Sequence, residues 1–187
     1  MSSLTYGLQN GAVSRLASET EIRIVDPSGE EVEPGETGEM LVRGPNVTPG
    51  YWTGPGRLEG IEDGWYRTGD LMRQDAEGNI WFVSREKDLI VRGGSNISPV
   101  EVERVLAAHP DIRDAAVIGV PDPVLGQRVL GFVQADEADE NLLGAVLDYA
   151  RLHLADYKLP ERLVAIPAIP RNGLGKVDRK LLAASAR

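Results

Sequence analysis

Cysteine is absent from this chain of 187 residues. Without thiols the chain can form neither a disulfide framework nor a thiolate zinc site. Long apolar runs are also missing, because none approaches the roughly 20 residues that a membrane-spanning helix needs. The N-terminal sequence MSSLTYGLQNGAVSR lacks the apolar stretch of a secretory signal peptide. Together these absences predict a cytoplasmic protein with no membrane span.

Basic charge and histidine are scarce as well. The chain has 20 Lys and Arg residues against 29 Asp and Glu residues, which gives a formal net charge of −9. This acidic excess argues against a nucleic-acid partner or a broad anionic-membrane surface. A small anionic ligand remains compatible, since local cations and backbone N–H groups can override the global sign. His109 and His153 have no paired ligands on their predicted helical faces, so we predict no metal site in this chain.

What is present is typical of a folded protein, with 42% hydrophobic and 26% charged residues. Alternation between polar and apolar residues predicts strands at 21–26, 39–43 and 79–84. The stretch 49–70 is dense in glycine, proline and aromatic residues, and we expect an ordered loop there. These strands have no evident cover, and isolated hairpins are marginal in water. Residues 1–84 are therefore predicted to be a β-rich part of something larger.

The second half has a different pattern. Ser98 followed by Pro99 and Glu101 forms a capping box that predicts the start of a helix. The order from about residue 88 is strand, helix, strand, strand, helix, strand and helix, which predicts a small sheet with helices on one face. The fold class is therefore α+β, with a β-rich N-terminal part followed by a small α+β domain.

Several polar and glycine motifs have ordinary structural interpretations when each is taken alone. Asp70 could cap a turn, and the alternating charges at 85–88 are typical of solvated surface. The pair Gly93-Gly94 is typical of a turn with positive φ. Lys176, next to Gly175, is more often a solvated loop tip than a catalytic cation. No single motif therefore identifies a function.

Five stretches taken in order do carry a resemblance. They are GETGEMLVRGPNVTPGYW, DGWYRTGDL, SREKDLIVRGGSNISPVEVE, VIGVPDPVLGQRV and YKLPERLVAIPAIPRNGLGKVDRKLL. The chain resembles the C-terminal third of the adenylate-forming enzymes, which include acyl- and aryl-CoA ligases, firefly luciferase and the adenylation domains of nonribosomal peptide synthetases. Five motifs in register make the resemblance specific, and they cover the chain from about Gly11 onward.

The resemblance implies a two-step reaction that uses ATP, Mg²⁺ and coenzyme A. A carboxylate attacks the α-phosphate of ATP, which gives an acyl-adenylate and pyrophosphate. A thiol, usually that of coenzyme A, then displaces AMP. Because two anions must meet in the first step, cations and oriented dipoles must neutralise the charge that develops.

The family pattern also implies roles for individual residues. Asp70 would accept hydrogen bonds from the ribose hydroxyls of ATP, and Arg85 would approach the ribose or a phosphate from the same side. Lys87 falls at the hinge position, where the family commonly has Asp and also has Lys. Residues 85–88 would then be the hinge, and 89–187 would form a mobile C-terminal domain that rotates between the two half-reactions.

Lys176 gains a role under the same resemblance. In the adenylating arrangement it would contact the substrate carboxylate and the α-phosphate from a flexible, glycine-flanked loop. Rotation would then replace it with Gly93 and Gly94, whose missing side chains would leave a channel for the pantetheine arm of coenzyme A. Leu174 stands where the family commonly has threonine, so a hydrogen bond from that hydroxyl is absent.

Two parts of the family's active site have no match in the sequence. These are the Ser/Thr/Gly-rich phosphate loop and the segment that supplies the magnesium-binding glutamate, and the acyl pocket lies in the same missing part. The main hypothesis is therefore the C-terminal portion of an AMP-forming acyl-CoA ligase, inactive alone. Its partners would be an N-terminal domain on the same or a separate chain, a carboxylic acid, ATP and coenzyme A.

Other interpretations stay open. The wording NGLGKVDRK also resembles the peptide synthetases, so the chain could be part of an adenylation domain. A stand-alone module that binds a partner chain or coenzyme A, and that complements a separate N-terminal half, is a hypothesis of another class. In that case the strands of 21–84 would be unpaired edges, or would pair in a homodimer by strand exchange. A luciferase-like oxygenase has little support in these residues.

Overall fold

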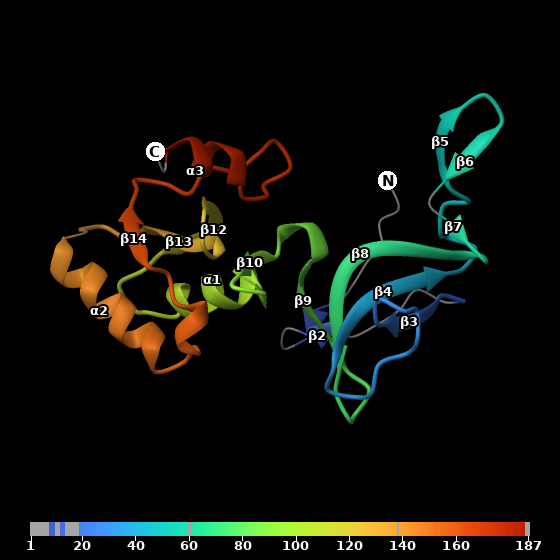
Figure 1. The fold of residues 1–187 in the computed structure, drawn as a ribbon, viewed down its shortest axis with the longest axis horizontal. Coiled ribbons are helices and arrows are strands. Elements are labelled where there is room, and N and C mark those ends of the chain that lie inside the picture. Colours follow the sequence, from blue (N-terminus) through green and yellow to red (C-terminus); the bar gives the residue numbers. More distant parts are fainter. Residues whose placement is uncertain (1–7, 10–11, 14–18, 60, 138, 186–187) are drawn as a thin grey trace. The chain divides into compact units, whose positions relative to one another are not determined.

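The computed structural model describes residues 8–9, 12–13, 19–59, 61–137 and 139–185. Contacts within the chain divide it after Lys87 into two compact units. We call the part up to Lys87 the β unit and the part from Asp88 onward the α+β unit, and each is described by itself (Figure 1). No helix in the described part of the chain is long and apolar enough to cross a membrane.

The β unit is built on one sheet of seven strands in the order β1-β2-β9-β8-β4-β3, with β7 beside β8. The strands of this sheet are β1 (Leu8–Gln9), β2 (Ala12–Val13), β3 (Glu21–Val25), β4 (Thr37–Arg43), β7 (Ile61–Glu62), β8 (Trp65–Gln74) and β9 (Ile80–Arg85). All of their pairings are antiparallel. A separate hairpin is formed by β5 (Tyr51–Gly54) and β6 (Arg57–Glu59).

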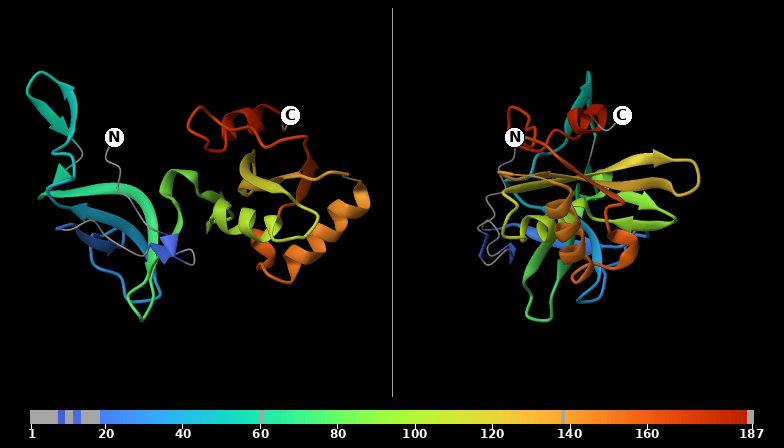
Figure 2. Two further views of the ribbon diagram at one scale, coloured as in Figure 1. Left: turned by 180° about the vertical axis from the view of Figure 1, so that it is seen from behind. Right: turned by 90° about the vertical axis from the view of Figure 1, so that its left-hand side faces the viewer.

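The long strand β8 joins the two halves of this sheet, because it pairs with β4 on one side and with β9 on the other. The strands β4 and β8 lie side by side and curve together in every view (Figures 1 and 2). The expectation that the strands of 21–84 are unpaired is wrong, since they pair with one another. This removes the reason for strand exchange, and a homodimer stays a prediction.

The prediction of a loop at 49–70 is also wrong, because this stretch contributes β5, β6, β7 and the first part of β8. Two of its glycines, Gly56 and Gly64, lie at turns and have φ values of 72° and 81°. The aromatic residues of this stretch occupy β5 and β8, which suits their preference for a pleated surface. High glycine content therefore marked the turns of several short strands.

The turn before β9 is organised by Asp75. Its carboxylate accepts hydrogen bonds from the Trp81 indole N–H at 3.0 Å and from the backbone and side chain of Asn79 at 2.8 and 3.0 Å. These bonds lower the pKa of Asp75 to about 2, and the bond from Trp81 has the largest effect. Asp75 thus closes the turn that joins β8 to β9.

The α+β unit has a sheet of five strands in the order β11-β10-β13-β12, with β14 parallel to β13. The strands are β10 (Ile90–Arg92), β11 (Ser95–Ile97), β12 (Asp114–Asp122), β13 (Gly126–Gln134) and β14 (Arg162–Ala165). The helices are α1 (Pro99–Ala107), α2 (Glu140–Arg151) and α3 (Arg179–Ser185), with a short 3₁₀ turn η2 (Asp156–Lys158). A second 3₁₀ turn, η1 (Glu86–Asp88), spans the boundary between the two units. Ser98 is confirmed as the N-cap, because its side chain accepts a bond from the Glu101 amide at 3.2 Å, while the Glu101 carboxylate pairs with Lys158.

Helices cover both faces of this sheet, so the expectation of helices on one face is wrong. Buried residues of α1 and α2 pack with Val117 and Val129 in one core. On the opposite face, Leu182 of α3 packs with Ile118 and Phe132. The residues of the two cores alternate along β12 and β13. Because both faces of these strands are apolar, each face must be covered by helices. Figures 1 and 2 show α3 on the opposite side of the sheet from α2.

Candidate functional site

A bulge in β8 carries the predicted nucleotide-binding carboxylate. On β4, Glu39 and Leu41 are separated by one residue, whereas their partners on β8, Leu71 and Arg67, are separated by three. The extra residues, which end with Asp70, bend the strand locally. Bulges of this kind re-aim side chains and occur frequently beside active sites.

The bulge is held by side chains on both strands. Thr68 donates a hydrogen bond to the Met40 carbonyl at 2.7 Å and accepts one from the Asp70 amide at 3.0 Å. The Gly69 amide donates to the carboxylate of Glu39 at 3.2 Å, and Gly69 has a φ of 68°, which favours glycine. Glu39 is buried and also pairs with Arg67. The position of Asp70 is thus fixed by its surroundings.

Asp70 and Arg85, both predicted from sequence, are brought together by the sheet. They lie directly opposite each other on β8 and β9. The Arg85 guanidinium makes a two-pronged contact, with Nε 2.6 Å from Oδ1 and Nη2 3.3 Å from Oδ2 of Asp70. The Asp70 side chain is 18% exposed and that of Arg85 is 40% exposed. A carboxylate offers only acceptor atoms, which is the chemistry that hydroxyl groups of a ligand require.

Residues that sequence analysis missed surround this pair. The hydroxyls of Tyr51 and Tyr66 lie 3.0 Å apart. This bond raises the pKa of Tyr66, and the charge of Asp70 raises it further while that of Arg85 lowers it. The role of Glu39 as the acceptor for the Gly69 amide was also missed. Its position next to the apolar run Met40–Val42 was a sequence signal for a buried carboxylate.

The predicted hinge and channel residues occupy simple local positions. Lys87 lies in η1 (Glu86–Asp88), where the β unit ends. Gly93 and Gly94 form the turn between β10 and β11, with φ values of 55° and 82°. The interpretation as a turn with positive φ is therefore confirmed. A side chain added at Gly94 would meet no atom within 4 Å, so the space beside it is open.

Lys176 lies on a hydrogen-bonded turn. The Asn172 side chain accepts bonds from the amides of Leu174 and Lys176 at 3.0 and 3.1 Å. The backbone N–H of Asn172 donates to the Lys176 carbonyl at 2.8 Å. Arg171 and Val177 form an isolated antiparallel β-bridge. Within the described residues the exposed ammonium of Lys176 has no ion pair or hydrogen bond. The turn therefore presents an unpaired cation to solvent.

Two ion pairs fasten the ends of this turn to the α+β unit. Arg171 contacts Asp114 at 2.5 Å, and Arg179 contacts Glu103 at 2.7 Å. Burial raises the pKa of the Glu103 carboxyl, and the neighbouring charge of Arg179 opposes that effect. The Lys176 turn is thus anchored to β12 on one side and to α1 on the other.

Replacing Asn172 with alanine should loosen this turn without unfolding the unit. Two hydrogen bonds of about 1 kcal/mol each would be lost, so we expect the Lys176 amide to exchange with solvent at least about tenfold faster. Amide hydrogen exchange measured by NMR tests this, with Asn96→Ala, an exposed asparagine of β11, as the matched control. Unchanged exchange at Lys176 would show that the side chain of Asn172 does not hold the turn.

Comparison with known proteins places these features in a family. The model for the AMP-binding enzyme C-terminal domain matches residues 101–176, and the model for the AMP-binding enzyme matches residues 5–52. The chain belongs to the adenylate-forming, AMP-binding enzymes. In relatives of this family the matching region is about a third of the protein.

Two relatives of the AMP-binding family represent different chemistries. Triostin synthetase I of Streptomyces triostinicus is 45% identical over 174 residues, which cover 91% of this chain and 33% of that protein. Indoleacetate–CoA ligase of Aromatoleum aromaticum is 42% identical over 170 residues, which cover 90% of this chain and 33% of that protein. The chain thus spans about a third of the length of the curated relatives that it matches.

Solved structures of the AMP-binding family share the fold. The o-succinylbenzoate CoA synthetase of Bacillus subtilis, in complex with ATP and a magnesium ion, matches with a TM-score of 0.80 and 35% identity. The match covers 92% of this chain and 35% of that one. In the part of the chain that the structure describes, no three acidic or histidine side chains are grouped to hold a metal ion.

Proposed function

We propose that these residues are the nucleotide-contacting and thiol-admitting part of an AMP-forming acyl-CoA ligase. The observation that carries the proposal is Lys176, an exposed cation without a partner in the described chain, held on a turn closed by Asn172. Formation of an acyl-adenylate joins a carboxylate to a phosphate, and a cation at the reacting atoms stabilises the charge that develops there. Lys176 would contact the substrate carboxylate and the α-phosphate.

Asp70 and Arg85 would hold the nucleotide. The Asp70 carboxylate offers only acceptor atoms, which suits the two hydroxyls of a ribose. Arg85 fixes the orientation of that carboxylate through both oxygens and keeps an exposed edge that can face the ribose or a phosphate. Support for these roles comes from the position of both residues on one face of the bulged strand pair, which stays accessible to a ligand.

The second half-reaction would use Gly93 and Gly94 instead of Lys176. Lys87, at the boundary between the two units, would act as the hinge that exchanges them. The open space beside Gly94 supports passage of the pantetheine arm of coenzyme A along the backbone. The phosphate loop, the magnesium ligand and the acyl pocket would come from an N-terminal domain on the same or another chain. A cytoplasmic location stays a prediction.

A second candidate is an adenylation domain that delivers its product to a carrier-protein thiol. The 45% identity to triostin synthetase I supports this candidate, and the 42% identity to indoleacetate–CoA ligase supports the first. Both candidates assign the same roles to Lys176, Asp70 and Arg85. They differ only in the thiol that reaches the glycine turn.

A chimera tests the proposed function. The N-terminal two thirds of the indoleacetate–CoA ligase would be joined to these residues at the matching position, so that the relative supplies the acyl pocket and phosphate loop. We expect indoleacetate, ATP and coenzyme A to give AMP and the CoA thioester. Adenylate formation without thioester would favour the carrier-protein candidate, and no adenylate at all would contradict the proposal.

A further inference from the structure

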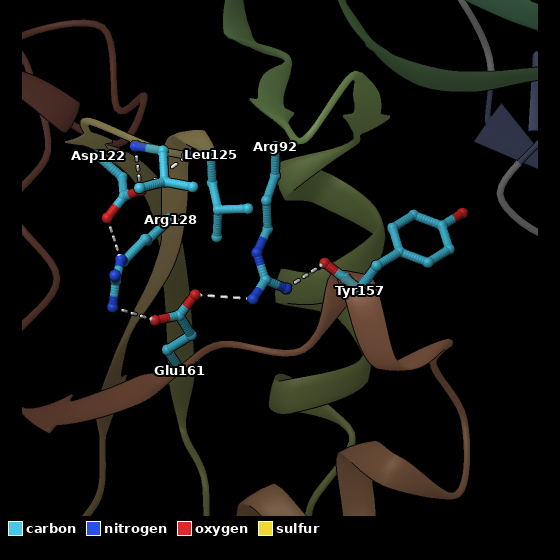
Figure 3. Close-up of polar contacts among 7 residues, drawn as sticks. Arg92, Asp122, Leu125, Arg128, Tyr157 and Glu161 are labelled. Atoms are coloured by element: carbon cyan, nitrogen blue, oxygen red, sulfur yellow. Dashed lines mark hydrogen bonds and ion pairs between the residues drawn. The ribbon is translucent and has the colours of Figure 1, made fainter.

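A chain of polar contacts leads from Arg92, the last residue of β10, through Glu161 and Arg128 to Asp122 and Leu125 (Figure 3). Arg92 donates to Glu161 at 2.7 Å and to the Tyr157 carbonyl at 2.8 Å. Glu161 also accepts a bond from Arg128 at 3.0 Å, and Arg128 pairs with Asp122. The chain of contacts thus runs from β10 through the start of β14 to the loop between β12 and β13.

This chain of contacts closes into a ring through the backbone. Asp122 accepts bonds from the amides of Val124 and Leu125 at 2.9 and 2.7 Å. The carbonyl of Leu125 then accepts the Gly93 amide at 2.8 Å. Gly93 directly follows Arg92, where the ring began. The glycine turn is therefore held from both sides, by the guanidinium of Arg92 and by the N–H group of Gly93.

Asp122 occupies the central place in this ring. Its side chain is only 6% exposed, and one carboxylate serves both the loop amides and Arg128. The loop that it shapes, 122–126, supplies the only interaction with the Gly93 amide in the described residues. The pairing of Arg92 with Ser95 closes the turn as a hairpin, and the bond to Leu125 adds a second restraint on Gly93, whose φ of 55° lies in a region that glycine adopts readily.

We propose that Asp122 is a positioning residue for thiol transfer, which fixes the Gly93–Gly94 turn through the Leu125 carbonyl. This inference rests on the proposed role of that turn as the passage for the thiol. Asp122 does not contact the reacting atoms, and its effect is confined to the shape of the turn. Loss of Asp122 should therefore impair the second half-reaction and spare the first, which depends on Lys176.

The structural part of the proposal is tested on the 187-residue chain. In Asp122→Ala we expect the Gly93 amide to exchange with solvent about tenfold faster, because the loop that accepts its hydrogen bond is released. Asp136→Ala is the matched control, since Asp136 pairs with Arg113 at the opposite end of the β12–β13 hairpin. Unchanged exchange at Gly93 in Asp122→Ala would overturn the proposal, whatever the chimera does.

The functional part is tested in the chimera by separate half-reactions. We expect Asp122→Ala to lower the thioester-forming rate about tenfold, with a raised KM for coenzyme A, and to leave adenylate formation within about twofold. Asp122→Asn, which keeps an oxygen for the loop amides but loses the charge facing Arg128, should recover part of the rate. Equal loss in both half-reactions would show a general structural role, and no loss in either would also overturn the proposal.

The two proposals fail in different ways. If the unmutated chimera forms no adenylate, the proposed function fails. Amide exchange at Gly93 in Asp122→Ala still tests whether Asp122 holds the glycine turn. If it forms adenylate and thioester normally and Asp122→Ala does the same, only the positioning role of Asp122 fails. Folding of each variant is checked by the amide signals of Val117 on β12 and Val146 on α2, which lie in the core and make none of the ring's contacts.

Discussion

Replacing Lys176 with alanine in the chimera will lower adenylate formation by about 10²–10³-fold, which is the usual cost of removing one group that stabilises developing charge. Thioester formation from a supplied adenylate will fall by less than about tenfold, because Lys176 acts only in the first step. The variant will fold normally, since the Lys176 side chain is exposed and makes no bond within the described residues. ATP–pyrophosphate exchange and single-turnover thioester formation measure the two steps separately.

Lys180→Ala is the matched control for this change. Lys180 is an exposed lysine only four residues further along, in α3, and its loss removes the same charge from the same end of the chain. We expect adenylate formation to stay within about twofold of the unmutated chimera. A similar loss in both variants would mean that general positive charge, and not the position of Lys176, assists the reaction.

Replacing Asp70 with alanine will raise the KM for ATP by at least about a hundredfold. Two hydrogen bonds from ribose hydroxyls to a charged acceptor are lost, and bonds to charged groups contribute about 1.5–3 kcal/mol each. The stability of the β unit will change little, because Arg85 is 40% exposed and water can replace its partner. Steady-state kinetics with varied ATP, together with thermal unfolding, measure both effects.

Asp75→Asn provides the opposite pattern. Asp75 also belongs to the β8–β9 hairpin. Hydrogen bonds from the Trp81 indole and from the amides of Asn79 and Glu77 lower its pKa to about 2. Its contribution to stability is present above the ordinary carboxyl pKa of 3.8 and is lost as the pH falls towards 2. Asp75→Asn should therefore lower the Tm at neutral pH and leave the KM for ATP unchanged.

An unchanged KM in Asp70→Ala would contradict the nucleotide role of Asp70.

Much of the fold was accessible from local sequence signals. Ser98 and Pro99 predicted the start of α1, and alternation predicted β3 and β9 to within a residue or two. Such signals act between residues that are close in the chain. The segment 49–70 escaped prediction because its strands are short and two of its glycines, Gly56 and Gly64, occupy turns.

The candidate site was only partly accessible for the same reason. Family motifs pointed to Asp70, Arg85 and Lys176, but their surroundings depend on contacts between distant segments. The Thr68–Met40 bond joins residues 28 positions apart, and the Arg92–Glu161 pair joins residues 69 apart. No periodicity within one segment reports such pairs. The bulge under Asp70 and the ring around Gly93 therefore required the structure.

The most direct test of the account is ATP–pyrophosphate exchange by the 187-residue chain, measured alone and after addition of the N-terminal two thirds of the indoleacetate–CoA ligase as a separate protein. We expect no exchange by the chain alone with short-, medium- or long-chain or aromatic carboxylic acids. We expect exchange to appear with indoleacetate when the second protein is added, and to disappear again with Lys176→Ala. Exchange by the chain alone that depends on Lys176 would contradict the account, because these residues would then build a complete ATP site themselves.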